Sequence, residues 1–125
     1  HGLIAPVIKN ADQQSLVELT KAVEGLALRA REERLTAKDM KNGTFTITNL
    51  GMLGVDQFQP IINPPQAAIL AIGRITQKAV VEGGSIVVKP MATLSLAFDH
   101  RIVDGAPAAR FLGRLREILQ TLEEE

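Results

Sequence analysis

Residues 94–122 constrain the fold most, because their hydrophobic period changes within a few positions. Leu94, Leu96 and Phe98 alternate with smaller residues, which predicts a strand with one apolar face over residues 94–98. After a charged turn, apolar residues recur at steps of three and four and predict an amphipathic helix: Ala108, Phe111, Leu112, Leu115, Ile118, Leu119 and Leu122. The chain therefore passes almost directly from a strand to a helix.

The turn between these elements contains the only internal histidine, His100. Asp104 stands where a helix N-cap is expected, and Pro107 is tolerated in the first helical turn. On this pattern alone, a histidine more often has a surface or capping role than a catalytic one. Imidazole, however, has a reference pKa of about 6.5, and the positive end of a helix dipole disfavours its charged form. A neutral His100 at this place could accept a proton.

The first part of the chain predicts an edge strand, a helix and a short helical turn. Residues 3–8 are an apolar strand-like run in which Pro6 allows only an edge or bulged position. Ser15 begins a capping box for an amphipathic helix that covers a sheet. The predicted buried face of that helix consists of Leu16, Leu19, Val23, Leu26 and Ala30. Residues 36–39 predict a second N-cap and a short turn that ends near Asn42.

Strands dominate the middle of the chain. Residues 44–48 alternate hydroxyl and apolar side chains, and residues 67–75 form a nearly continuous apolar run. Residues 78–81 and 85–91 are separated by a hairpin signal at residues 82–85. Prolines make residues 56–66 an ordered loop, in which burial is expected for Phe58, Ile61 and Ile62. Together these elements predict an α/β fold with two layers, a mixed β-sheet covered by helices.

Charge and composition argue against several classes of function. The chain has 125 residues, with 14 basic and 14 acidic side chains well mixed along the sequence, which gives no electrostatic signal for binding nucleic acid or an anionic membrane. It contains no cysteine, which excludes disulfides and thiolate metal sites, and we expect no metal. No apolar run approaches the length that crosses a bilayer.

Four segments resemble one known family. Residues 99–105 fit the pattern D-H-R-x-x-D-G, and residues 2–8, 43–51 and 61–70 follow the same family in the same order. The family is that of the dihydrolipoamide acyltransferases, the core components of 2-oxo acid dehydrogenase complexes, whose fold is similar to chloramphenicol acetyltransferase. The resemblance covers the C-terminal half of the family's catalytic domain. It therefore implies that residues 1–125 are the C-terminal part of a single domain, with the N-terminal part absent.

The resemblance also implies a reaction and the residues that perform it. The family transfers an acyl group between the dihydrolipoyl arm of a lipoyl domain and coenzyme A. His100 would be the general base, and Asp104 would support it as a helix cap or through an arginine partner. Thr48 would donate to the oxyanion of the tetrahedral intermediate, at a place where serine is the better-known residue. A strand threonine by itself more often reflects β-propensity.

Partners and location follow from the same resemblance. The family forms homotrimers that build a larger symmetric core, with the active-site channel at the subunit interface. Further partners would be the lipoyl domain and the dehydrogenase and dihydrolipoamide dehydrogenase components, in bacterial cytoplasm or the mitochondrial matrix. Acetyl, succinyl and branched-chain forms share these motifs, so the acyl group stays open.

The chemistry itself is compatible with these residues. One neutral histidine can take a proton from a thiol of pKa about 8.5 and return it to the leaving thiolate. A single oxyanion donor is worth about 3 kcal/mol. Two alternatives remain: a non-catalytic core module whose isolated piece is inactive, and an unrelated coenzyme A acyltransferase that acts on a small free acceptor.

Overall fold

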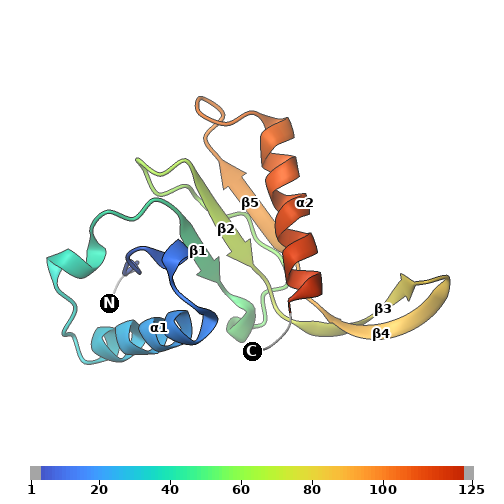
Figure 1. Cartoon of the computed structure of the whole chain (residues 1–125), viewed down its shortest axis with the longest axis horizontal. Coiled ribbons are helices and arrows are strands. Elements are labelled where there is room, and N and C mark those ends of the chain that lie inside the picture. Colours follow the sequence, from blue (N-terminus) through green and yellow to red (C-terminus); the bar gives the residue numbers. More distant parts are fainter. Residues whose placement is uncertain (1–3, 123–125) are drawn as a thin grey trace. The chain divides into compact units, whose positions relative to one another are not determined.

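The computed structural model describes residues 4–122, which form two compact units that divide after Thr44. The first unit contains α1 (Leu16–Arg31) and two short 3-10 helices, η1 (Ala11–Gln13) and η2 (Ala37–Met40). The second contains the strands, the 3-10 helix η3 (Gly51–Leu53) and the helix α2 (Gly105–Thr121). Figure 1 follows the chain through these elements.

Side-chain hydrogen bonds cap α1 and η2, the two segments of the first unit for which N-caps are predicted. The Ser15 hydroxyl accepts a hydrogen bond from the backbone N–H of Glu18 (3.1 Å), which satisfies one of the free donors at the start of α1. The Asp39 carboxylate accepts the backbone N–H of Thr36 (2.9 Å) and pairs with Arg29 (2.9 and 3.2 Å). The bond from Thr36, followed by that from Arg29, holds the pKa of Asp39 below its ordinary value.

The predicted edge strand at residues 3–8 is wrong for the described residues 4–8, and Leu3 lies outside the described range. Pro6 has no N–H to donate, and the N–H of Val7 donates to the carbonyl of Asp39 in η2 (2.7 Å). No strand therefore lies beside this segment in the described part of the first unit. The apolar face of α1 is also largely open, since only Leu26 of its residues is buried.

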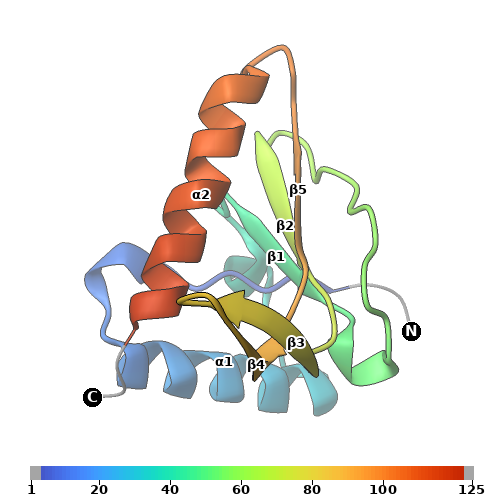
Figure 2. The same ribbon diagram turned by 90° about the vertical axis from the view of Figure 1, so that its right-hand side faces the viewer.

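A three-stranded mixed sheet forms the body of the second unit, as predicted. The strands are β1 (Thr46–Asn49), β2 (Ala68–Ile72) and β5 (Leu94–Phe98), in the order β1-β2-β5. β1 is parallel to β2, and β5 is antiparallel to it. Ile69, Leu70 and Ala71 of the central strand β2 are buried, together with Ala108 of α2. Figure 2 shows α2 along one face of this sheet, so helix and sheet form two layers.

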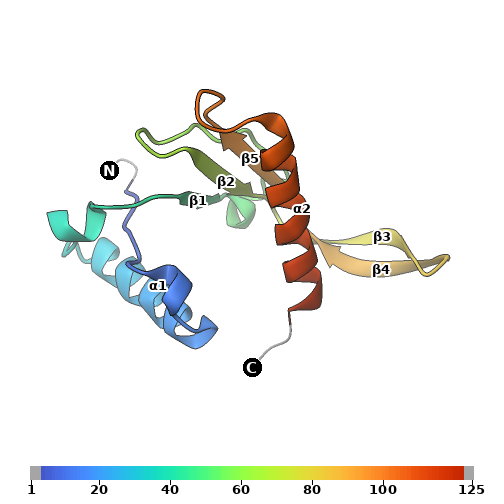
Figure 3. The same cartoon turned by 45° about the horizontal axis from the view of Figure 1, so that its top comes forward.

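The predicted hairpin is also present. β3 (Thr76–Glu82) and β4 (Ser85–Met91) pair in antiparallel register through Gly83 and Gly84, whose φ angles of 58° and 81° suit glycine. Figure 3 shows that the hairpin extends away from the three-stranded sheet. Its apolar residues Val81 and Ile86 are accordingly exposed.

Residues 56–66 contain no helix or strand, which confirms the loop predicted from their prolines. Pro60 is buried, and Phe58 and Ile62 are half-buried. The expected burial of Ile61 is wrong, because this side chain is 87% exposed. Its neighbours Pro60 and Ile62 take the inward positions, and adjacent side chains of an extended chain point in opposite directions.

Candidate active site

The connection from β5 to α2 is organised by Asp99. The backbone N–H of Asp99 donates to the carbonyl of Ala67 (2.8 Å), beside the start of β2. Its own carbonyl accepts the N–H groups of Ile102 (2.9 Å) and Val103 (2.8 Å), which closes the turn. The turn therefore begins at a fixed point of the sheet and returns directly into α2.

The Asp99 carboxylate holds Arg101 as well. Oδ1 accepts the backbone N–H (2.9 Å) and Nε (3.0 Å) of Arg101, and Oδ2 accepts Nη2 (2.8 Å). The side chain of Asp99 is only 16% exposed, whereas that of Arg101 is 90% exposed. The side-chain bonds from Arg101 are the main reason that the pKa of Asp99 is lowered to about 2. The same pair raises the pKa of Arg101.

His100 stands between these two residues and is exposed. Its ring lies against the ring of Phe98, with centroids 4.9 Å apart and planes tilted by 50°. No polar group among residues 4–122 makes a hydrogen bond or ion pair with the imidazole. Both ring nitrogens are therefore available to an incoming group.

Asp104 occupies the N-cap position of α2 as predicted, and its carbonyl accepts the N–H of Ala108 (3.2 Å). The expected capping bond of its side chain is absent, which corrects that prediction. An N-cap side chain usually binds the N–H of the second or third helical residue. Here the third is Pro107, which has no N–H, and Arg101 is already bound to Asp99. The exposed carboxylate of Asp104 has no partner among residues 4–122.

Thr48 lies in β1 opposite Ala71 of β2, and its side chain is half-buried. Its hydroxyl makes no side-chain hydrogen bond to any other described residue and can serve as a donor. The chain after Thr48 is held against the end of β2, because Leu50 N–H donates to the carbonyl of Ile72 (3.2 Å). The side chain of Asn49 accepts the N–H of Gly51 (2.8 Å), which begins η3.

The structure does not bring Thr48 and His100 together within one copy of the chain. Thr48 of β1 pairs with Ala71 of β2, which pairs with Ser95 of β5. Two strand spacings of about 4.8 Å therefore separate β1 from β5. Phe98 lies three residues further along β5, at about 3.3 Å per residue. The backbone distance from Thr48 to Phe98 is therefore about 14 Å, and His100 lies beyond Phe98.

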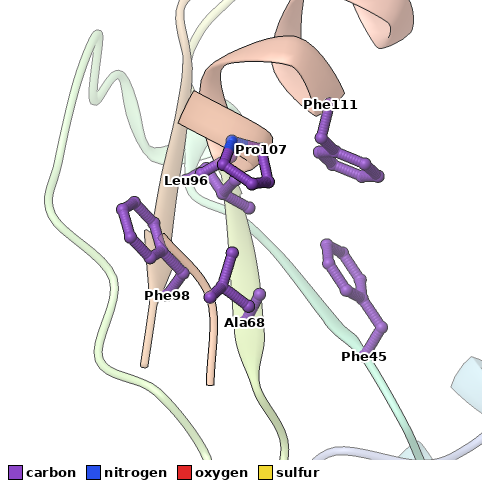
Figure 4. A pocket seen from close by; sticks show the side chains of 8 residues that line it. Phe45, Ala68, Leu96, Phe98, Pro107 and Phe111 are labelled. Carbon is purple, nitrogen blue, oxygen red and sulfur yellow. The ribbon is translucent and has the colours of Figure 1, made fainter. Parts of the chain in front are cut away.

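An apolar cavity of about 160 Å³ lies between α2 and the sheet. Figure 4 shows the rings of Phe45 and Phe111 at this site, where their centroids are 5.9 Å apart. Phe98, which supports the His100 ring, also lines the cavity. The lining contains no titratable side chain, so this cavity offers no acid or base of its own.

Two kinds of site are not found in the described residues. Within residues 4–122, no group of three or more His, Asp or Glu side chains is placed to hold a metal ion. The helices of the same range are too short or too polar to cross a membrane.

Comparison with known proteins gives the family. The family described as 2-oxoacid dehydrogenases acyltransferase (catalytic domain) matches residues 1–124. The chain belongs to this family. A curated relative from Bacillus subtilis, the dihydrolipoyllysine-residue acetyltransferase component of pyruvate dehydrogenase complex, is 48% identical over 118 residues.

Solved structures agree with this assignment. A dihydrolipoamide acetyltransferase from Azotobacter vinelandii superposes with a TM-score of 0.92 at 42% identity, over 96% of this chain and 49% of that chain. Its structure was determined to study the catalytic roles of a serine, a histidine and an asparagine. The cubic core of a pyruvate dehydrogenase multienzyme complex gives a TM-score of 0.90 at 42% identity, over 94% of this chain and 49% of that one. These matches confirm the predicted fold, which is that of the acyltransferase catalytic cores.

The match covers only part of each relative. The Bacillus subtilis alignment includes 94% of this chain but 27% of the relative. The chain spans about half the length of the solved cores it matches.

Sequence reasoning named His100, Asp104 and Thr48 as candidate site residues but did not identify the pair of Asp99 with Arg101. The signal was present, because an acid and an arginine on either side of a histidine can form a pair across it. The same turn gives Asp104 no partner, so Asp99 replaces it as the residue that organises the connection.

Proposed function

We propose that this chain acts in a dihydrolipoamide acetyltransferase, which transfers an acetyl group between a dihydrolipoyl thiol and coenzyme A. The Bacillus subtilis relative named above is the dihydrolipoyllysine-residue acetyltransferase component of a pyruvate dehydrogenase complex. The observation that supports it most directly is the free imidazole of His100, presented at the end of β5 in the residue pattern of the family.

The spacing of the three candidate residues supports their roles. In the Azotobacter vinelandii relative, the interval from the studied serine to the studied histidine equals the interval from Thr48 to His100. The studied asparagine follows that histidine at the interval at which Asp104 follows His100. Threonine retains the hydroxyl of serine. Asp104 replaces a neutral amide with a carboxylate, and its role is a supporting one beside the base.

Each proposed residue has a defined step. The neutral imidazole of His100 takes the proton of the attacking thiol, and the sulfur forms a bond to the thioester carbonyl carbon. The Thr48 hydroxyl donates to the oxygen that becomes negative in the tetrahedral intermediate. The intermediate then expels the other thiolate, which receives the proton from the imidazolium. No covalent intermediate with the enzyme forms, so the absence of cysteine is no obstacle.

Two copies of the chain would contribute to each site. Thr48 and a His100 that lies more than about 14 Å away along the sheet cannot touch one tetrahedral centre. A ring of copies in which each His100 faces the next copy's hydroxyl would solve this geometry, and a homotrimer is the smallest such ring that the family implies. An isolated single copy of residues 1–125 would therefore be inactive.

The proposed partners follow from the same assignment. They are the lipoyl domain that delivers the acetyl group, coenzyme A as its acceptor, and the dehydrogenase and dihydrolipoamide dehydrogenase components of the complex. A bacterial cytoplasmic location would fit the bacterial relatives. Residues 1–125 would be the C-terminal part of one catalytic domain.

Co-expression of two inactive variants tests the shared site. His100→Ala and Thr48→Val subunits, each made alone, should show little exchange of acetyl groups between acetyl-coenzyme A and dihydrolipoamide. When both are made in one cell in the native protein, random assembly should leave about a quarter of the sites with both groups intact. Exchange should then return to about a quarter of the wild-type rate.

The controls separate the parts of this proposal. The same two variants purified separately and mixed without subunit exchange should stay inactive. Assembled mixtures with no more activity than either variant would show that both groups act within one copy. Full activity of the His100→Ala protein alone would contradict the proposed reaction mechanism.

A further inference from the structure

The direction of the His100 ring depends on very few contacts. No hydrogen bond to residues 4–122 fixes either nitrogen, and the ring packs against that of Phe98. A general base must lie within about 3 Å of the proton it takes, and a misplacement of about 1 Å can reduce a rate about 100-fold. The backbone on both sides of His100 must therefore be held precisely for the residue to act.

Asp99 holds both sides. Before His100, its backbone N–H is bound to Ala67 of the sheet (2.8 Å). After His100, its carboxylate accepts the backbone N–H of Arg101 (2.9 Å) and two guanidinium N–H groups (3.0 and 2.8 Å). These bonds enclose a single residue, and that residue is His100.

An ordinary surface ion pair would not have these properties. Exposed pairs such as Arg114–Glu117, with a single contact of 3.4 Å, contribute little to stability. The Asp99 carboxylate is mostly shielded from solvent, uses both oxygens and also binds a backbone N–H. Its pKa of about 2 keeps it ionised at neutral pH, so the charge that pairs with Arg101 is present there. The three bonds from Asp99 to Arg101 are called the clamp.

The geometry points to Asp99 as a positioning residue that orients His100 through its three bonds to Arg101. This inference rests on the proposed role of His100 as the base. Asp99 itself does not touch the reacting atoms. It fixes the peptide groups on both sides of the imidazole and thereby the ring's position on Phe98.

Asp99→Asn in the native protein tests the inference, because the amide keeps one acceptor oxygen but loses the charge and the second acceptor. We expect kcat for acetyl exchange to fall between about 10-fold and 100-fold, with KM for coenzyme A changed less than about twofold. Arg101→Lys keeps the positive charge but loses the two guanidinium donors that bind both oxygens of Asp99. It should give a smaller fall in kcat, again with little change in KM. Glu117→Gln is the matched control and should leave both constants unchanged.

A second measurement does not depend on activity. We expect the Phe98 ring, 4.9 Å away, to shift the NMR signals of the His100 ring protons, and His100→Ala will identify these signals by their loss. In the Asp99→Asn protein the signals should move toward those of a free histidine, while the circular dichroism spectrum stays that of the folded protein. If the Asp99→Asn protein does not fold, kcat and the His100 ring signals of the Arg101→Lys protein test the positioning role instead.

The outcomes distinguish the inference from the proposed function. If His100→Ala abolishes exchange but Asp99→Asn and Arg101→Lys keep wild-type kcat and ring shifts, the positioning role is wrong and the base assignment stands. If His100→Ala keeps full activity, the proposed function fails first. A fall in kcat with moved ring signals in both clamp variants establishes Asp99 as the positioning residue.

Discussion

The two ends of the three-stranded sheet hold their reactive groups by different means. At the His100 end, neighbours in sequence make most of the bonds, from Asp99 to Arg101, Ile102 and Val103. At the Thr48 end, the position of the hydroxyl depends on pairing with β2 and on a loop held by residues far along the chain. A local turn can be read from adjacent residues, whereas the Thr48 end exists only once the sheet has formed.

Removing the imidazole at the locally built end should have the largest effect on activity. His100→Ala deletes both proton transfers and should reduce kcat for acetyl exchange by about 10²–10⁴-fold. Because His100 is exposed and bonds to no described residue, the free energy of unfolding should hardly change. Steady-state kinetics together with urea unfolding measure the two effects. Loss of activity that is accompanied by unfolding would mean that the histidine supports the turn instead.

Removing the hydroxyl at the other end should have the next largest effect. Thr48→Val keeps the shape and β-propensity of the side chain but deletes the oxyanion donor, which is worth about 3 kcal/mol or about 100-fold in kcat. Thr48→Ser is the control, because it restores a donor and should retain activity within a few-fold. Equal rates for the valine and serine variants would show that the hydroxyl has no role in the reaction.

Because the Thr48 end depends on contacts between residues distant in sequence, we expect its stability to be sensitive to substitution at Gly73. A Cβ at this buried glycine would lie 1.9 Å from the carbonyl oxygen of Asp56. The backbone beside Asp56 is held in place, because the N–H of Arg74 donates to the carbonyl of Val55 (2.8 Å). Gly73→Ala should therefore lower the free energy of unfolding by roughly 3 kcal/mol. Denaturant unfolding measures this change.

The same substitution at Gly113 provides the control. A Cβ there meets nothing within 4 Å, and Gly113 lies in the interior of α2. Gly113→Ala should raise the free energy of unfolding by up to about 1 kcal/mol. Two alanine variants with the same sign would contradict the close approach at Gly73.

The sequence could predict what is local in this molecule. The strand at residues 94–98, the helix after Asp104 and the hairpin at Gly83 and Gly84 all follow from periodicity and turn chemistry. The side-chain cap expected from Asp104 is the local prediction that was wrong, because Pro107 removes one of the two usual donors. These features depend on residues within one turn of each other.

The arrangement of the site could not be predicted in the same way. Which strands are neighbours, and in which register, is decided by contacts between distant residues. Without the order β1-β2-β5, nothing shows that Thr48 and His100 lie at opposite ends of the sheet. The exposed Ile61 illustrates the same limit, since apolar character alone does not decide which side of a loop faces inward.

Acid should loosen the His100 end before any change at the Thr48 hydroxyl, which does not titrate in this range. The pKa of Asp99 is about 2 in the folded chain and 3.8 in its ordinary state, so the unfolded chain binds the proton more readily as the pH falls. The stabilisation from the Asp99–Arg101 pair is therefore fully present above about pH 5 and is lost as the pH falls toward 2. Urea unfolding of wild type and Asp99→Asn from pH 6 to pH 2 should show a difference that shrinks across this range. Asp39, whose pKa is also lowered, contributes to both proteins equally and cancels in the comparison. A difference that stays constant down to pH 2 would mean that the aspartate acts through its shape alone, without the charge that pairs with Arg101.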